Sequence, residues 1–374
     1  MSRMTASPKP RVLVIGPLPP PVHGVTLCLQ NLLAHREQLP VEIVHLDSRF
    51  TDSHGSLGKF SVRKGFRLLG YLTRLMRQLL FGRIRAVVTT PTFYFKPFLK
   101  DALFIWCAWL LRKPVHGWIH NDFRLLAEEM TGWKSTIART TLRRLGKIIL
   151  VAPRLANYVP DWLDASRITV IENGVPDPPR HRDWSATFHS PPHFIYLSQM
   201  NDAKGWRDLL KAAEILAARG LHPEFHFYGR PAFETTPAMI ESALKESLTR
   251  GVNATWHGAI YDDAKWSMLA NADALIFPSW HEAFPLAILD AMAVGLPIVA
   301  TDVGGVADAL DDDLGGQIIP PRQPQSLALA METLLTHSPA EMGRHNRQRY
   351  LANFTPQAYA ERWAAFFHSL YESN

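Results

Sequence analysis

Short apolar runs alternate with longer amphipathic stretches along the chain, and the whole alternation occurs twice. Short apolar runs predict buried strands, and apolar residues at helical spacing predict helices that cover a sheet. In the first half of the chain, the predicted strands are 12–15, 41–46, 86–89, 115–119 and 148–152. In the second half, they are 194–198, 224–228, 254–257, 274–277, 297–300 and 317–319.

Helical patterns fill the intervals between these strands. The predicted helices include 24–33, 66–80, 206–219, 237–249, 262–270, 285–294 and 324–335, and a last one covers 356–371. Regular alternation of strands and helices favours parallel sheets with helices on both faces. We therefore expect an α/β protein with two Rossmann-like, doubly wound domains.

The Pro-rich stretch between residues 175 and 192 continues neither pattern and predicts a domain boundary. We place an acceptor-binding domain at 1–180, a donor-binding domain at 181–355, and a terminal helix at 356–374 that packs back toward the first domain. Ligands of open parallel sheets bind at the carboxyl ends of the strands. A cleft between the two domains is therefore the expected site.

Composition narrows the class of protein. The chain has 374 residues, of which 47% are hydrophobic, and only two cysteines, Cys28 and Cys107. No disulfide framework is expected, which fits a reducing cytoplasm. The N-terminal apolar run is too short for a signal peptide, and no run reaches the ~18 residues that a spanning helix needs.

The charge of +6 is unevenly distributed. Residues 53–100 contain no Asp or Glu but ten Lys or Arg, so the rest of the chain carries 6 − 10 = −4. Such a segment favours an anionic partner: nucleic acid, lipid headgroups or a pyrophosphate-bearing substrate. Arginines alternate with leucines between 63 and 79, so we expect segment 59–85 to bind the anionic inner membrane face peripherally. The alternative is an ordinary surface helix rich in arginine.

The stretch SWHEAFPLAILDAMAVGLPIVAT, starting at Ser279, places Glu282 and Asp290 around the start of an apolar helix. Pro285 is expected in the first turn and Phe284 at the cap, so the amides of Leu286 and Ala287 need an outside acceptor, for which a phosphate is suited. One carboxylate would then hold a sugar on each side of a diphosphate. The alternative is that Glu282 caps the helix and Asp290 is solvated.

Several segments in this order resemble the family 4 retaining glycosyltransferases, whose fold is GT-B. The stretch above resembles their Glu-x7-Glu motif, and the likeness extends over nearly the whole chain. The other segments that carry it are 16–24 (GPLPPPVHG), 118–122 (WIHND), 170–175 (VIENGV), 196–205 (YLSQMNDAKG), 256–260 (WHGAI) and 302–308 (DVGGVAD).

The resemblance implies transfer of a hexose or N-acetylhexosamine from a UDP- or GDP-linked sugar to the hydroxyl of a glycan or lipid-linked acceptor, with no metal and no resident cofactor. Glu282, His120 and Lys204 are the implied catalytic residues: Glu282 holds the sugar hydroxyls, His120 orients the sugar, and Lys204 neutralises the diphosphate. The implied donor-binding residues are Gly24, Gln199, Lys204, His257, Gly258, Ile260, Phe284, Pro285, Leu286, Ala287 and Asp290.

Taken singly, these residues have plainer interpretations. Gly24 could mark only a tight turn, Lys204 a solvated lysine and His120 a core histidine. His116 and Cys28 are read as structural.

Two positions depart from the resembled pattern. Asp290 replaces a glutamate and is shorter by one methylene, and Gln199 replaces an arginine and lacks its charge and bidentate fork. A non-catalytic nucleotide-sugar-binding homologue is therefore the main alternative. A nucleic-acid-binding protein is disfavoured because no recognition motif is present, and sugar-nucleotide epimerisation is disfavoured by the order of the motifs.

Overall fold

The computed structural model describes residues 8–49, 62–183, 187–310 and 314–371, without the side chains of 62–66. The chain forms two compact units. Unit 1 comprises Met1–Asn173 and Pro356–Asn374, and unit 2 comprises Gly174–Thr355. The first division lies seven residues before the boundary placed from the sequence, because the chain after Asn173 already contacts unit 2: the amide of Val175 donates to the carbonyl of Phe354 at 3.0 Å.

Unit 1 is a six-stranded parallel sheet in the order β2-β1-β3-β4-β5-β6. Its strands are β1 (Arg11–Gly16), β2 (Glu42–Asp47), β3 (Ile84–Thr89), β4 (Val115–Ile119), β5 (Ile148–Leu150) and β6 (Ile168–Val170). The first five coincide with predicted strands to within a few residues. The short edge strand β6 was not predicted.

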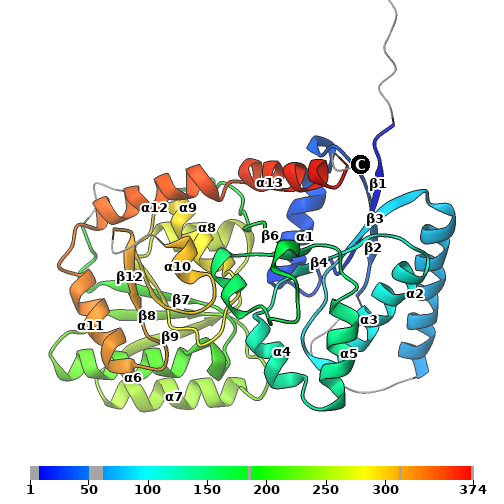
Figure 1. Ribbon diagram of the computed structural model, residues 1–374. Helices are drawn as coiled ribbons and strands as arrows, with labels where there is room; N and C mark the ends of the chain where they lie inside the picture. The colour runs from blue at the N-terminus through cyan, green and yellow to red at the C-terminus, as the bar shows by residue number, and fades with distance from the viewer. Residues whose placement is uncertain (1–7, 50–61, 184–186, 311–313, 372–374) are drawn as a thin grey trace, which may run out of the picture. The chain divides into compact units, whose positions relative to one another are not determined.

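Helices cover the sheet of unit 1 (Figure 1). They are α1 (Gly24–Ala34), α2 (Val62–Phe81), α3 (Phe95–Leu110), α4 (Phe123–Glu129), α5 (Trp133–Leu142) and α13 (Pro356–Ser369). None of the helices in the described part of the chain is both long enough and apolar enough to cross a membrane.

The C-terminal helix α13 completes the core of unit 1. Trp363 is fully buried, and its ring meets that of Trp118 edge-on at 4.8 Å. Tyr359, one turn earlier, donates a hydrogen bond to the carbonyl of Cys28 at 3.1 Å. The aromatic residues recur at helical spacing because one face of α13 is buried along its length.

Unit 2 is a second six-stranded parallel sheet, in the order β12-β11-β10-β7-β8-β9. The strands are β7 (His193–Leu197), β8 (Glu224–Tyr228), β9 (Asn253–Gly258), β10 (Ala274–Phe277), β11 (Ile298–Thr301) and β12 (Gly316–Ile319). Its helices are α6 (Trp206–Ala218), α7 (Pro237–Thr249), α8 (Asp262–Ala270), α9 (Leu286–Val294), α10 (Val306–Ala309), α11 (Pro324–Leu334) and α12 (Pro339–Asn353). All six strands were predicted, and the prediction of two Rossmann-like α/β sheets is confirmed.

The strand order of unit 2 reverses beside β7. The chain runs from β7 outward through β8 and β9, and then returns to place β10 on the other side of β7. In parallel sheets a reversal of this kind opens a crevice at the carboxyl ends of the two central strands, where ligands bind. The loops after β7 and β10 therefore lie at the position where a binding site is expected.

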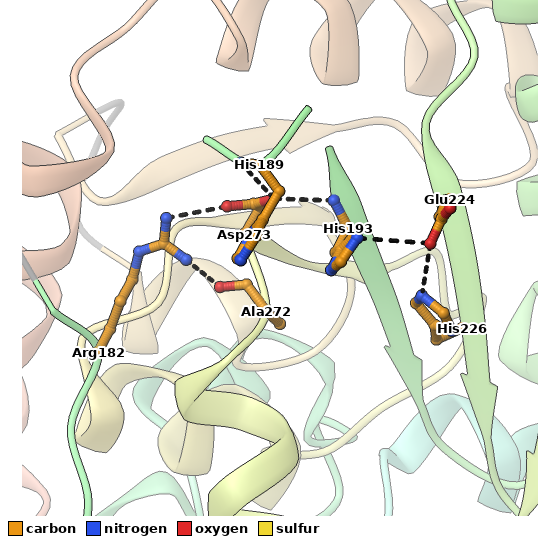
Figure 2. Close-up of polar contacts among 7 residues, drawn as sticks. All are labelled: Arg182, His189, His193, Glu224, His226, Ala272 and Asp273. Carbon is orange, nitrogen blue, oxygen red and sulfur yellow. Dashed lines mark hydrogen bonds and ion pairs between the residues drawn. The ribbon is translucent and has the colours of Figure 1, made fainter. Parts of the chain in front are cut away.

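At their other, amino-terminal ends, β7 and β10 are tied together by a buried aspartate (Figure 2). Asp273, directly before β10, accepts hydrogen bonds from Arg182 Nη2 (2.9 Å), His189 Nδ1 (2.9 Å) and the amide of His193 (2.8 Å). Burial by itself raises the pKa of Asp273, but these donated hydrogen bonds outweigh it and hold the pKa below its usual value.

The polar network continues from His193 across the amino-terminal ends of β7 and β8. Its Nε2 lies 3.4 Å from the carboxylate of Glu224, which also lies 3.6 Å from Nε2 of His226 (Figure 2). These contacts link the starts of β7 and β8 to the segment before β10. They fix the strands whose far ends carry the candidate site.

Candidate functional site

Three loops at the carboxyl ends of β7, β10 and β11 form one packed layer in unit 2. The amide of Trp280, after β10, donates to the carbonyl of Ala203, after β7, at 2.8 Å. The amide of Gly305, after β11, donates to the carbonyl of Ala283 at 2.8 Å. Backbone hydrogen bonds thus hold the Glu282 segment from both sides.

Two glycines allow this close approach. Gly205 has φ +71°, and a Cβ there would lie 1.9 Å from the carbonyl oxygen of Pro278. Gly304 has φ +53°, and a Cβ there would lie 1.9 Å from the carbonyl oxygen of Glu282. Any side chain at Gly205 or Gly304 would push the loops apart. Close packing of the loops therefore requires glycine at both positions.

Glu282 and Lys204 meet, although 78 positions separate them in the sequence. Lys204 Nζ lies 2.5 Å from Glu282 Oε1 and 3.2 Å from the carbonyl of His281. The hydroxyl of Ser279, which is 1% exposed, donates to the same Oε1 at 3.0 Å. The Glu282 carboxylate is therefore held in one orientation, with the side chains of Lys204 and Glu282 23% and 13% exposed.

The loop also has an outer support. Trp280 Nε1 donates to the carboxylate of Asp208 in α6 at 2.7 Å, and the guanidinium of Arg322 lies 4.5 Å from the Trp280 ring centroid. Sequence reasoning singled out neither Ser279 nor these supporting residues. A serine after a buried strand is too common to indicate a role without its partner.

The helix after Glu282 begins one residue later than predicted. Pro285 has extended backbone geometry (φ −77°, ψ 120°) and is itself the N-cap, so the expected cap at Phe284 was wrong, as was the placement of Pro285 in the first turn. Neither residue supplies a capping oxygen. The amides of Leu286 and Ala287 donate to no acceptor among the described residues, as the prediction of an anion site requires.

Asp290 is neither solvated nor free. It is 6% exposed, and its Oδ2 lies 2.7 Å from Nζ of Lys265 in α8. Burial raises the pKa of Asp290, and the nearby positive charge of Lys265 offsets part of that effect. The alternative of a solvated helix residue was therefore wrong, and a lysine that the sequence did not indicate shares the carboxylate.

The segment expected to meet the nucleotide base ends β9. His257 is exposed on the strand, its ring stacks on that of Tyr228 at 4.6 Å, and its Nε2 lies 3.1 Å from Nδ1 of His226. Gly258 has φ +76°, a Cβ there would meet no atom within 4 Å, and its carbonyl accepts from the amide of Gly229 at 2.7 Å. Gly258 and Ile260 are half-buried, in the turn just before α8 begins.

Gln199 lies two residues after the end of β7, in the same loop as Lys204. Its carbonyl accepts from the hydroxyl of Tyr196 at 2.8 Å, and the residue is half-buried. In unit 2 the structure thus brings together the loops that carry Gln199, Lys204 and Glu282.

Two further candidates lie in unit 1. Gly24 begins α1, and a Cβ there would meet no atom within 4 Å, so the space beside it is open. His120 directly follows β4, and its ring lies 4.4 Å from that of Trp118. Its Nε2 is enclosed and has no hydrogen-bond partner among the described residues.

Burial and the neighbouring charge of His23 lower the pKa of His120 to about 3, so the imidazole is neutral near pH 7. Whether Gly24 and His120 face Glu282 across a cleft stays a prediction. Within residues 8–49, 62–183, 187–310 and 314–371, no three His, Cys, Asp or Glu side chains are grouped so that they could hold a metal ion.

Residues 191–337 match the family Glycosyl transferases group 1. This group 1 region contains the loops of Lys204 and Glu282, the turn at Gly258 and all of α9.

Curated relatives match part of the chain. Glycogen synthase of Mycobacterium tuberculosis is 28% identical over 201 residues, which cover 52% of this chain and 47% of that protein. D-inositol 3-phosphate glycosyltransferase of Paenarthrobacter aurescens is 38% identical over 160 residues, which cover 41% and 38%. The matched part thus spans about half, or less, of the length of these relatives.

Solved structures extend the likeness of fold to nearly the whole chain. Sucrose-phosphate synthase from Thermosynechococcus elongatus has a TM-score of 0.74 at 17% identity and covers 98% of this chain and 100% of that one. The HepE protein of Anabaena in complex with UDP-glucose has a TM-score of 0.72 at 16% identity and covers 96% and 99%. The predicted GT-B fold class is confirmed.

Proposed function

We propose that this protein is a retaining glycosyltransferase that moves a hexose or an N-acetylhexosamine from a nucleoside diphosphate sugar to an acceptor hydroxyl. One observation carries the proposal: Lys204 and Glu282 are held together at the strand-order reversal of unit 2, next to the open amides that begin α9. The family match over 191–337 supports it. So does the solved complex of the similarly folded HepE protein with UDP-glucose.

Each group has a role in this reaction. The bond between the anomeric carbon and the diphosphate oxygen breaks, and the negative charge that develops on the leaving diphosphate is met by the Lys204 ammonium and the amides of Leu286 and Ala287. Because these donors are fixed before the donor sugar binds, little reorganisation is needed as the charge develops.

The Glu282 carboxylate accepts hydrogen bonds from the hydroxyls of the transferred sugar, and the Ser279 hydroxyl keeps it oriented. His120, neutral near pH 7, would help to orient the same sugar. The acceptor oxygen attacks the anomeric carbon on the face that the diphosphate leaves, and its proton passes to the departing diphosphate. This front-face substitution retains the anomeric configuration.

The finer parts of the proposal concern the substrates and the location. We propose a UDP- or GDP-linked donor, no metal and no resident cofactor, and a lipid-linked or cell-surface glycan precursor as acceptor. A lipid-linked acceptor would place the protein at the inner membrane face, and the arginine-rich α2 supports that location. Gly24 is proposed to approach the donor through its open backbone.

The alternative is a non-catalytic protein that only binds nucleotide sugars. Two observations favour it: Gln199 brings no charge to the diphosphate, and Asp290 is already engaged by Lys265. This alternative keeps the nucleotide site but predicts no turnover.

Turnover with a panel of UDP- and GDP-sugars separates the two functions. We expect the wild-type protein to hydrolyse or transfer at least one donor, and Glu282→Ala and Lys204→Ala each to lower kcat about 100-fold to 1,000-fold. Lys211→Ala, an exposed lysine on α6, is the matched control and should leave the rate unchanged. Nucleotide binding without any turnover would favour the non-catalytic alternative, and absence of both would refute the proposal.

A further inference from the structure

Trp280 has no role in the function proposed above, yet it connects the loops that follow β7, β10 and β12. Its amide donates to the carbonyl of Ala203, the residue before Lys204, at 2.8 Å. Its indole Nε1 donates to Asp208 Oδ2 at 2.7 Å, and its ring centroid lies 4.5 Å from the guanidinium of Arg322. Trp280 is therefore held at its main chain, at the edge of its ring and at the face of its ring.

Asp208 is a carboxylate in an otherwise apolar place. It is 8% exposed and lies in the first turn of α6, where Trp206, Leu209 and Leu210 are also buried. A carboxylate withdrawn from water costs free energy unless it receives hydrogen bonds. The start of a helix favours its negative charge, and the indole N–H of Trp280 supplies a directed donor. An apolar side chain would pack there without this cost, so the hydrogen bond to Trp280 is what aspartate contributes.

Arg322 contacts the face of the ring from a strained backbone. It follows β12 and has φ +61°, in the left-handed region that favours glycine. Strain of this kind recurs where a side chain serves function. Arg322 is exposed, so packing in a core does not explain it, whereas the cation–π contact with Trp280 is one that glycine would lack.

The turn that Trp280 connects to its surroundings carries the Glu282 carboxylate. Within this turn, the hydroxyl of Ser279 donates to Glu282 Oε1 at 3.0 Å. Lys204 Nζ lies 3.2 Å from the carbonyl of His281. These bonds hold the turn together, while the Trp280 side chain fixes it to α6 and to the loop after β12. Without that connection the turn can shift as a unit, and a displacement of about 1 Å at a reacting group lowers a rate as much as 100-fold.

We propose that Trp280, held by Asp208 and Arg322, is a positioning residue for the transfer. It acts through Glu282: the fixed indole holds the turn, and the turn keeps the carboxylate directed at the hydroxyls of the transferred sugar. This inference rests on the proposed function. Because the three residues act on the geometry of Glu282 and not on the nucleotide, their loss lowers kcat and leaves nucleotide affinity nearly unchanged.

The test is steady-state kinetics with a nucleotide sugar that the wild-type protein turns over, together with the calorimetric Kd of UDP or GDP, whichever that donor carries. Trp280→Phe removes the N–H but keeps an aromatic ring, and Asp208→Leu removes the acceptor. We expect each to lower kcat about 10-fold to 100-fold, with KM and Kd within about threefold of the wild type. Asp208→Asn keeps an oxygen that accepts from the indole and should retain at least about a third of the wild-type kcat. Trp133→Phe, which replaces a 65% exposed tryptophan of unit 1, is the control and should keep the wild-type kcat.

Two further variants separate folding from positioning. Trp280→Phe/Asp208→Leu replaces both partners by apolar groups, so its Tm should lie closer to the wild-type value than that of either single variant. Its kcat should stay as low as that of either single variant, because both substitutions remove the same hydrogen bond.

Arg322→Gly removes the left-handed strain together with the guanidinium, so its Tm should stay close to the wild-type value. Its kcat should fall about twofold to fivefold, the equivalent of an exposed cation–π contact. Arg112→Gly, at an exposed position of unit 1 with φ +55°, is the matched control and should leave kcat unchanged.

The possible failures are distinguishable. If the wild-type protein turns over a donor and the folded Trp280→Phe variant keeps the wild-type kcat, the role assigned to Trp280 is wrong, while the proposed function stands. If kcat recovers together with Tm in the double variant, Trp280 and Asp208 serve stability alone, and the inference is also wrong. If the wild-type protein turns over no donor, the proposed function fails and this inference fails with it.

Discussion

At the scale of single residues, the candidate site depends on pairs of side chains that come from different loops or helices. Glu282 and Lys204 were both predicted, and the structure joins them at 2.5 Å. Ser279 and Lys265 were not predicted, because their importance lies in contacts between loops or helices that no local pattern encodes. Both contact a carboxylate that was predicted: Ser279 contacts Glu282, and Lys265 contacts Asp290.

One buried histidine predicts a dependence of stability on pH. Nδ1 of His116 accepts a hydrogen bond from the amide of Lys147 at 3.0 Å, so that nitrogen must be unprotonated in the folded protein. Burial and the charge of Lys147 lower its pKa from 6.5 to about 4. Because the unfolded chain binds the proton more readily, the stabilisation is present above pH 6.5 and is lost as the pH falls toward 4.

We expect wild-type unit 1 to lose about 2 kcal/mol more stability than His116→Gln between pH 7 and pH 5. Glutamine keeps a hydrogen-bond acceptor and cannot gain a proton. Urea titrations of the whole chain at both pH values measure the difference. Equal losses in the two proteins would show that His116 does not contribute to the pH dependence.

At the scale of elements, buried strands and long helices were predictable and short or unpatterned ones were not. Strand β6 has only three residues, Ile168–Val170, which is too short for periodicity to register. Helix α3 is apolar over most of its length, so its pattern does not distinguish a helix from a strand. Helix α9 was placed to within one residue because seven of its nine residues are buried between flanking loops.

Helix α2 carries the prediction of membrane binding. Its apolar stripe is partly used by unit 1, since Leu75 and Leu79 are buried, but Leu80 and Phe81 are 54% and 78% exposed. Lys59 lies outside the described residues. An exposed apolar end beside arginines suits an anionic membrane surface.

We expect the protein to float with vesicles that contain anionic phosphatidylglycerol at low salt, and Arg74→Gln/Arg77→Gln to weaken that binding about 10-fold or more, at about 1 kcal/mol for each arginine. Both arginines are exposed. Lys245→Gln/Arg344→Gln removes two exposed charges from unit 2 as a control and should float like the wild type. Failure of the wild type to float at low salt would remove the membrane proposal.

At the scale of the whole molecule, most residues proposed to bind the donor lie in unit 2, while Gly24 and His120 lie in unit 1. Gln199, Lys204, the turn at Gly258 and α9 all fall within Gly174–Thr355, which is one continuous segment. The two-sheet organisation was predictable because each half of the chain repeats the strand–helix alternation. How the halves face each other depends on contacts that neither pattern specifies.

We therefore expect residues 174–355, expressed alone, to fold and to bind UDP or GDP with a Kd within about 10-fold, or about 1.4 kcal/mol, of the whole chain. Calorimetry measures the Kd, and circular dichroism with a cooperative thermal transition confirms folding. A folded fragment that does not bind a nucleotide bound by the whole chain would show that unit 1 supplies an essential part of the nucleotide site.

The return of α13 to unit 1 has a consequence for how the protein is made. Trp363 and Tyr359 leave the ribosome after all of unit 2, yet they cover Trp118 and the backbone of Cys28, which emerged before it. While the nascent chain is still growing, that part of the first sheet has no cover and exposes aromatic surface to chaperones. Unit 2, whose residues are contiguous, can finish folding before the unit that was started first.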